Sequence, residues 1–132
     1  MKTVIISMLF LITTLSTYCQ TQTGLNNKSK GTYEKSDKEL NQVYQKIIQI
    51  YKSDTIFLKT MQEAQRQWVK FRDAQLKMKY PPYPNSNESV LSMCRYYYLE
   101  ELTKDRIKDL KEWIDGVEEG DVCSGSIKLK GQ

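Results

Sequence analysis

Histidine is absent from this 132-residue chain, and glycine, cysteine and proline are scarce, with 6, 3 and 3 residues. Without histidine, the chain lacks both the commonest general base and the commonest metal ligand. It also has no glycine-rich phosphate loop, no GxSxG nucleophile elbow and no HExxH helix. We therefore expect a protein that is not an enzyme, with no catalytic residue, no metal and no cofactor.

Charge of one sign is not concentrated anywhere in the chain. The 20 lysines and arginines exceed the 16 aspartates and glutamates, for a net charge of +4. The two signs are interspersed, which is typical of solvated helix faces. Because a nucleic-acid-binding protein usually gathers its cations into a patch or stripe, the sequence predicts no nucleic-acid partner.

A long apolar run is also missing. The uncharged apolar segment Val4–Leu15 is shorter than the ~20 residues that span a bilayer, so we expect no integral membrane span. With Lys2 before it, this segment predicts a signal peptide over residues 1–19 and a secreted or periplasmic protein. The alternative is a lipid anchor on Cys19, although Tyr18 stands where lipoproteins usually carry glycine or alanine.

The remaining residues predict one all-α domain. Residues 20–31 are polar, which indicates a disordered tether, and residues 32–132 have the length of one domain. Apolar residues recur at three- and four-residue steps, so we expect helices over about 32–53, 55–79 and 88–115. Their short connections favour a small three-helix antiparallel bundle or hairpin.

The second of these helices carries the clearest apolar seam. Its members follow one another at steps of four and three, which predicts packing against a neighbouring helix. We expect Trp68 and Phe71 of this seam to lie in the core beside Leu110 of the third helix. The full seam consists of Phe57, Met61, Ala64, Trp68 and Phe71.

Two arginines, Arg72 and Arg106, stand within otherwise apolar stripes. A buried guanidinium requires a partner, because an unpaired buried charge is costly. The candidate partners are Asp37, Asp73 and Asp105. We favour interhelical ion pairs that fix the register of the helices. A pair of arginines that binds an anion is the alternative.

Cleavage after residue 19 would leave two cysteines, Cys94 and Cys123. Because export favours oxidation, we predict a disulfide between them that staples the C-terminal tail to the third helix. Closing a loop of roughly 30 residues would stabilise the fold by about 3–4 kcal/mol. The alternative is two free thiols.

A proline-rich segment, Tyr80-Pro81-Pro82-Tyr83-Pro84-Asn85, connects the second and third helices. Proline ends a helix and stiffens a loop, and tyrosine is enriched at protein interfaces. The segment is therefore either a rigid connector with tyrosines folded onto the bundle or a partner-binding loop. The residues of that loop would be Tyr80, Tyr83, Asn85, Ser86 and Asn87.

Several segments resemble one known family in their order along the chain. The segments are Asp37–Tyr44, then Gln67-Trp68-Val69-Lys70-Phe71-Arg72-Asp73-Ala74, then Cys94, and finally Thr103 with Arg106 and Leu110. Together they resemble the LprI-like lysozyme-inhibitor domain of bacterial envelopes, over about residues 33–113. The family commonly has a cysteine where this chain has Leu76 and often another before the first helix, so its disulfide pattern does not carry over.

This resemblance implies a small helical protein of the cell envelope whose partner is another protein, which the family's named activity identifies as lysozyme. Lysozyme works with two carboxylates in a cleft, and a stiff loop with hydrogen-bond donors suits such a cleft. Many lysozymes are basic, however, and attract a positively charged partner poorly. The alternative is a structural or interaction module of the envelope without lysozyme activity.

Overall fold

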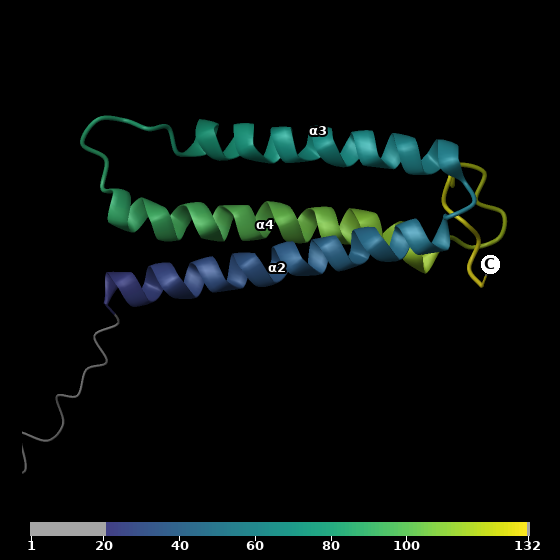
Figure 1. The fold of residues 1–132 in the computed structure, drawn as a ribbon, viewed down its shortest axis with the longest axis horizontal. Helices are drawn as coiled ribbons and strands as arrows, with labels where there is room; N and C mark the ends of the chain where they lie inside the picture. The colour runs from purple at the N-terminus through teal and green to yellow at the C-terminus, as the bar shows by residue number, and fades with distance from the viewer. Residues whose placement is uncertain (1–20, 132) are drawn as a thin grey trace, which may run out of the picture.

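The computed structural model describes residues 21–131, which contain three helices: α2 (Gln22–Ile50), α3 (Thr55–Lys79) and α4 (Glu88–Asp115). Consecutive helices run in opposite directions, so α2 and α4 are parallel to each other (Figure 1). Within this range the only β-type pairing is an isolated bridge between Val117 and Leu129. The predicted all-α class and the three helices are confirmed.

No helix of residues 21–131 is long and apolar enough to cross a membrane. The predicted signal peptide over residues 1–19 and the alternative lipid anchor at Cys19 lie outside the described residues.

Local signals determine the ends of α3 and α4, which match the predicted bounds. At the start of α3, Asp54 Oδ1 accepts a hydrogen bond from the Phe57 backbone N–H at 2.9 Å. At the start of α4, Asn87 Oδ1 accepts one from the Val90 N–H at 3.3 Å. Both are N-caps that satisfy otherwise unpaired donors. α4 ends at Gly116, whose φ of 71° is a conformation that glycine adopts without strain.

The disordered tether predicted over residues 20–31 is wrong from Gln22 onward, because this stretch begins α2. Thr21 caps the helix, with its Oγ1 accepting from the Gly24 N–H at 3.2 Å. Ser29 is 0% exposed, and its hydroxyl donates to the Asn26 carbonyl at 2.9 Å within the helix. Packing of such residues onto α4 supplies the stability that their helix propensity lacks.

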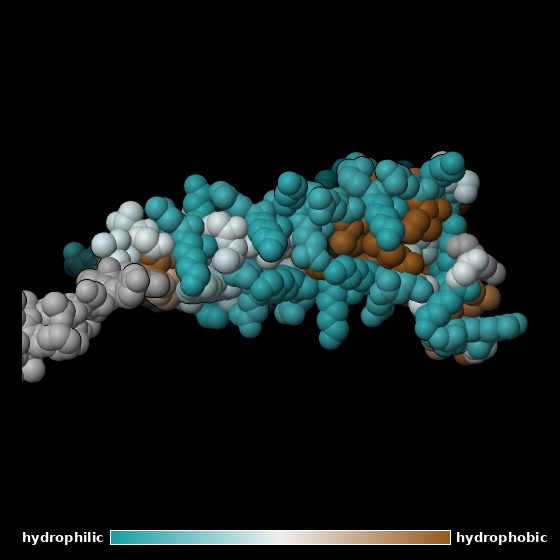
Figure 2. Space-filling model, turned by 90° about the horizontal axis from the view of Figure 1, so that it is seen from below, coloured by the Kyte–Doolittle hydropathy of each residue, from teal (hydrophilic) through white to brown (hydrophobic). Residues whose placement is uncertain are grey.

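The hydrophobic core lies toward the end of the bundle where α2 turns into α3. In the face drawn in Figure 2, hydrophobic surface also gathers toward this end. We call it the tail end, because the C-terminal residues 116–131 lie there (Figure 1). The buried apolar side chains are Leu40, Val43, Ile47, Tyr51, Phe57, Met61, Ile107 and Leu110.

The opposite end, which we call the loop end, is packed differently. Here α2 and α4 meet through small buried side chains, Ser29 and Ser36, and through an aromatic pair, Tyr33 and Tyr96, whose ring centroids are 6.0 Å apart. The Ser36 hydroxyl donates to the Thr32 carbonyl at 3.3 Å in its own helix, so its burial leaves no unpaired donor. Small side chains allow close approach of the helices but bury little apolar surface.

Helix α3 buries side chains only in its first half, at Phe57 and Met61. Phe71, predicted to lie in the core, is instead 54% exposed. A 3.5-residue repeat drifts by about 20° per heptad on a straight helix, so the seam has rotated by about 40° between Phe57 and Phe71. Trp68 is partly buried against the core, and Leu110 is fully buried, as predicted.

The C-terminal tail closes the tail end of the bundle. The Lys128 backbone N–H donates to the Tyr51 hydroxyl at 3.0 Å, and Lys128 Nζ donates to the Ile50 carbonyl at 3.1 Å. The tail also approaches the end of α4 so closely that a Cβ on Gly116 would lie 2.9 Å from the Lys128 carbonyl oxygen. Glycine is therefore required at this position for steric as well as conformational reasons.

The disulfide predicted between Cys94 and Cys123 is not formed, and both residues are free cysteines. The helix from Cys94 to Asp115 is about 30 Å long at 1.5 Å per residue. A disulfide requires Cα atoms within about 7 Å of each other. Because the tail folds over the tail end rather than back along α4, Cys123 remains far from Cys94.

Candidate functional site

A cluster of Trp68, Arg72 and Arg106 lies between α3 and α4. The Cζ atoms of Arg72 and Arg106 lie 5.3 Å and 5.9 Å from the centroid of the Trp68 ring. At these distances each guanidinium is attracted to the ring electrons. The fold thus brings together residues of the predicted core motif that are far apart in the sequence.

Arg72 is paired with two of its predicted partners. Its side chain is 13% exposed, with Nη2 2.9 Å from Asp73 Oδ1 and Nη1 3.7 Å from Asp37 Oδ1. Because Asp37 belongs to α2, this pair connects α3 to α2 near the loop end. Burial raises the pKa of the neighbouring Tyr33, and the charge of Arg72 partly opposes that rise. The arrangement is what an ion pair between helices requires.

Arg106 does not form the predicted ion pair. No carboxylate among residues 21–131 lies within 4 Å of its guanidinium, Asp105 included. Its Nε instead donates to the neutral Gln65 Oε1 at 3.1 Å. Burial lowers the pKa of Arg106, and the charge of Asp109 opposes this at longer range. Thr103, three residues before Arg106 in the sequence, is buried, and its hydroxyl has no hydrogen-bond partner among the described residues.

The loop between α3 and α4 has a defined backbone. The Ser86 N–H donates to the Tyr83 carbonyl at 3.3 Å, which closes a β-turn. Pro84 stands at the second position of this turn and Asn85 at the third, where φ is 67°. A type II turn requires this combination of proline followed by a residue with positive φ. The loop therefore contains a turn of defined type, and it extends beyond the ends of both helices (Figure 1).

Three of the five predicted loop residues are engaged within the protein. The Tyr80 ring packs edge-on against Tyr98, with centroids 6.2 Å apart. The Ser86 hydroxyl bonds to the Glu88 carboxylate, and Asn87 caps α4. These three side chains hold the loop in place.

The other two predicted loop residues, Tyr83 and Asn85, form the exposed tip. Tyr83 is 68% exposed, and neither side chain makes a hydrogen bond to the described residues. The nearby cations are already engaged: Arg95 pairs with Glu88, and Lys79 Nζ lies 3.7 Å from the centroid of the Tyr98 ring. The tip therefore presents a neutral amphipathic side chain rather than a free charge.

Among the acidic side chains near the loop, Glu88 accepts hydrogen bonds from Arg95 and from the Ser86 hydroxyl. The Arg95 hydrogen bond lowers the pKa of Glu88, as does the bond from Ser86. Among residues 21–131, no group of three or more histidine, cysteine, aspartate or glutamate side chains is arranged to hold a metal ion.

Two residues that contact predicted residues, Gln65 and Ser126, were not predicted from the sequence. Gln65 occupies the same face of α3 as Trp68, so a helical wheel contains the signal for its contact with Arg106. Ser126 accepts a hydrogen bond from Trp113 Nε1 at 3.0 Å, and no local signal predicts this contact because the path of the tail is a tertiary property.

Comparison with known families gives one match. Residues 15–110 match the family model described as "Lysozyme inhibitor LprI". This range includes α2, α3 and most of α4 with the loop between them. The comparison with curated proteins finds no match, and neither does the comparison with solved structures.

Proposed function

Because the chain belongs to the LprI family of lysozyme inhibitors, we propose that it binds lysozyme and blocks its activity by protein–protein contact. The proposal places the protein in the secreted or periplasmic space, after removal of residues 1–19. It acts by binding and carries out no chemistry of its own.

The exposed tip of the α3–α4 loop is the surface that we propose contacts lysozyme. Tyr83 is 68% exposed on a loop whose neighbouring side chains hold it in place. A tyrosine fixed in this way loses little conformational freedom on binding, and it offers both an apolar ring and a hydroxyl donor. Tyr83 and Asn85 would enter the cleft of lysozyme, where the hydroxyl and the amide can donate to its carboxylates.

Inhibition is tested by mixing the purified protein with hen-type lysozyme and following the clearing of a bacterial cell-wall suspension. We expect saturable inhibition of lysis. Tyr83→Ala should weaken inhibition by about tenfold or more, because an aromatic anchor at the centre of an interface is worth about 2 kcal/mol or more.

Tyr97→Ala is the matched control, since Tyr97 is also exposed but lies on α4 away from the loop. This variant should inhibit as strongly as the unaltered protein. Unchanged lysis at a large excess of folded protein would refute the inhibitor proposal. Equal loss in both tyrosine variants would instead refute the role of the loop.

The alternative is an interaction module of the cell envelope without lysozyme activity, which the excess of lysine and arginine over aspartate and glutamate favours. A basic lysozyme and a protein with net positive charge repel each other at long range. Under this alternative the same loop binds another envelope protein. Crosslinking from a photoreactive residue at position 83 in an envelope extract would then yield one defined product that is not lysozyme.

A further inference from the structure

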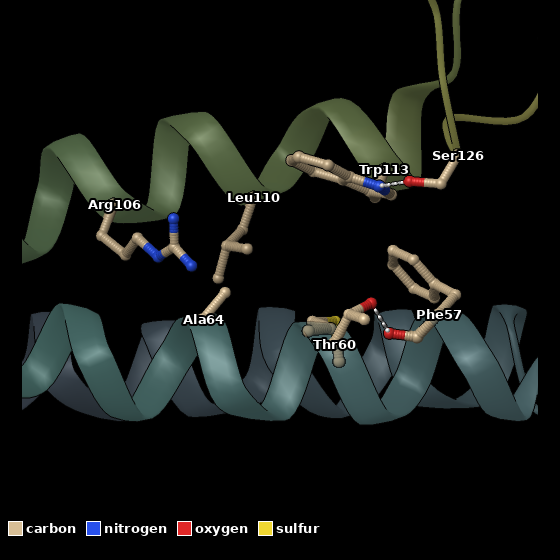
Figure 3. A pocket seen from close by; sticks show the side chains of 8 residues that line it. Phe57, Thr60, Ala64, Arg106, Leu110, Trp113 and Ser126 are labelled. Carbon is tan, nitrogen blue, oxygen red and sulfur yellow. Dashed lines mark hydrogen bonds between the residues drawn. The ribbon is translucent and has the colours of Figure 1, made fainter.

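A pocket of about 250 Å³ lies between α3 and α4 near the tail end. Figure 3 shows that it is elongated along the helices, with Arg106 toward one end and Trp113 and Ser126 at the other. Arg106 and Trp113 are seven positions apart on α4, a distance of about 10 Å along the helix. Between them the walls include Phe57, Ala64 and Leu110.

The end of the pocket near Trp113 is mainly apolar, because most of its polar groups are hydrogen-bonded within the protein. The indole N–H of Trp113 is its sole donor, and it is already bonded to Ser126 Oγ at 3.0 Å. The Thr60 hydroxyl donates to the Phe57 carbonyl at 2.8 Å within α3. Apart from the Ser126 hydroxyl, which accepts the bond from Trp113, this end therefore presents mainly ring faces and hydrocarbon to any occupant.

The Arg106 end has the opposite character. Its guanidinium reaches toward α3 beside Leu110 and Ala64 (Figure 3). A guanidinium has five N–H donors, of which the Nε–H is bonded to Gln65. The two Nη groups make no hydrogen bond to residues 21–131, and no carboxylate of these residues lies within 4 Å. A half-buried guanidinium with both Nη groups free can receive a carboxylate in bidentate geometry.

We propose that this pocket binds a small organic acid, with its carboxylate on Arg106 and its apolar chain extending toward Trp113. At roughly 30 Å³ per water-sized group, the pocket holds about eight non-hydrogen atoms, the size of hexanoate. Each end of such a ligand meets the end of the pocket that matches its polarity. This proposal is independent of lysozyme inhibition and involves a different part of the molecule from the loop tip.

The test uses hexanoate and hexanamide, which have the same number of non-hydrogen atoms but differ in charge. The chain has 2 tryptophans. Trp113 lines the pocket and Trp68 lies beside Arg106. Their indole N–H resonances in an NMR spectrum therefore report binding directly. We expect hexanoate to shift both resonances in a saturable manner. Hexanamide should bind about tenfold more weakly or worse, because it lacks the charge-assisted bond.

Two variants locate the site. Arg106→Met should weaken hexanoate binding by about tenfold and remove the preference over hexanamide. Ala64→Phe should abolish the binding of both compounds by filling the pocket. The matched control is Arg66→Met, which removes an exposed arginine of α3 that pairs with Glu63. This control should bind hexanoate as the unaltered protein does.

Three results would overturn the proposal: shifts that grow linearly without saturation, equal affinity for acid and amide, or unchanged hexanoate affinity in the Arg106→Met variant. If that variant does not fold, the Ala64→Phe variant decides, since saturable binding that survives there rules out this pocket. Failure of the protein to inhibit lysozyme would leave these titrations unaffected.

Discussion

The two ends of the bundle are held together by different kinds of contact. At the tail end, large apolar side chains from all three helices form one core, and the C-terminal tail covers it. At the loop end, α2 and α4 meet through Ser29 and Ser36, while α3 is attached by polar and aromatic contacts such as Arg72 with Asp37. The comparison indicates that the tail end supplies most of the apolar burial, while the loop end holds the α3–α4 loop through small, polar and aromatic side chains.

The largest change in the free energy of unfolding is expected when a side chain in the tail-end core is truncated. Ile47 is 0% exposed, so Ile47→Ala should lower the free energy of unfolding by about 3 kcal/mol. Ser29→Ala at the loop end, equally buried, should change it by less than about 1 kcal/mol. Ile56→Ala, where the side chain is 79% exposed, is the control. Denaturant titration measures all three, and equal losses at Ile47 and Ser29 would contradict the contrast.

Substitutions at two glycines, one at each end of the bundle, test the same difference in packing between the tail end and the loop end. Gly116→Ala should destabilise the protein by about 1–3 kcal/mol, because its φ is 71° and the new Cβ would meet the Lys128 carbonyl. Gly31→Ala should stabilise α2 by about 0.5–1 kcal/mol, since no atom lies within 4 Å of its Cβ position and alanine favours a helix. Thermal unfolding of both variants checks the two signs, and stabilisation by Gly116→Ala would show that the tail does not pack as described.

A smaller effect is expected from the ion pair that attaches α3 at the loop end. Arg72→Met should cost about 1 kcal/mol, because the arginine is largely covered but both aspartates are partly exposed. Amide hydrogen exchange should speed up in the second half of α3 more than in its first half. Arg66→Met, which removes an exposed pair within α3, should change exchange little. If exchange speeds up equally along the whole of α3, the ion pair does not stabilise the second half of the helix separately from the first.

The smallest predicted effect concerns pH. The hydrogen bond from Lys104 lowers the pKa of Glu100, against the rise that its burial would cause. A carboxylate with a lowered pKa stabilises the fold at neutral pH, and this contribution is lost as pH falls below about 4.3, the usual value for glutamate. Glu100→Gln should therefore reduce the loss of stability between neutral and acidic pH. Denaturation midpoints at several pH values, with Glu101→Gln as control, measure this, and parallel profiles would exclude the contribution.

Much of the fold was predictable because its signals are local. Asp54 and Asn87 cap α3 and α4, and the prolines after Tyr80 end α3, so the bounds of both helices follow from short stretches of sequence. The candidate loop was predictable for the same reason. Its division into anchored residues and an exposed tip was not, because the position of Tyr80 depends on Tyr98, which is far along the chain.

Other features depend on partners that no local pattern identifies. The segment that begins at Gln22 is helical because α4 packs against it, although its polar composition predicted a tether. Phe71 is exposed because the seam of α3 rotates away from the neighbouring helices. Arg106 has no carboxylate within 4 Å among residues 21–131, since the adjacent Asp105 lies about 100° away around the same helix.

The sequence by itself determined the bounds of α3 and α4, the family and the position of the proline-rich loop, since caps, prolines and motif residues act over a few positions. Tertiary structure alone decided that the core lies at the tail end and that Cys94 and Cys123 lie too far apart to bond. It also decided that a pocket forms between α3 and α4. These properties depend on how whole helices pack, and packing is determined by the combined shape and burial of residues that are distant in the sequence.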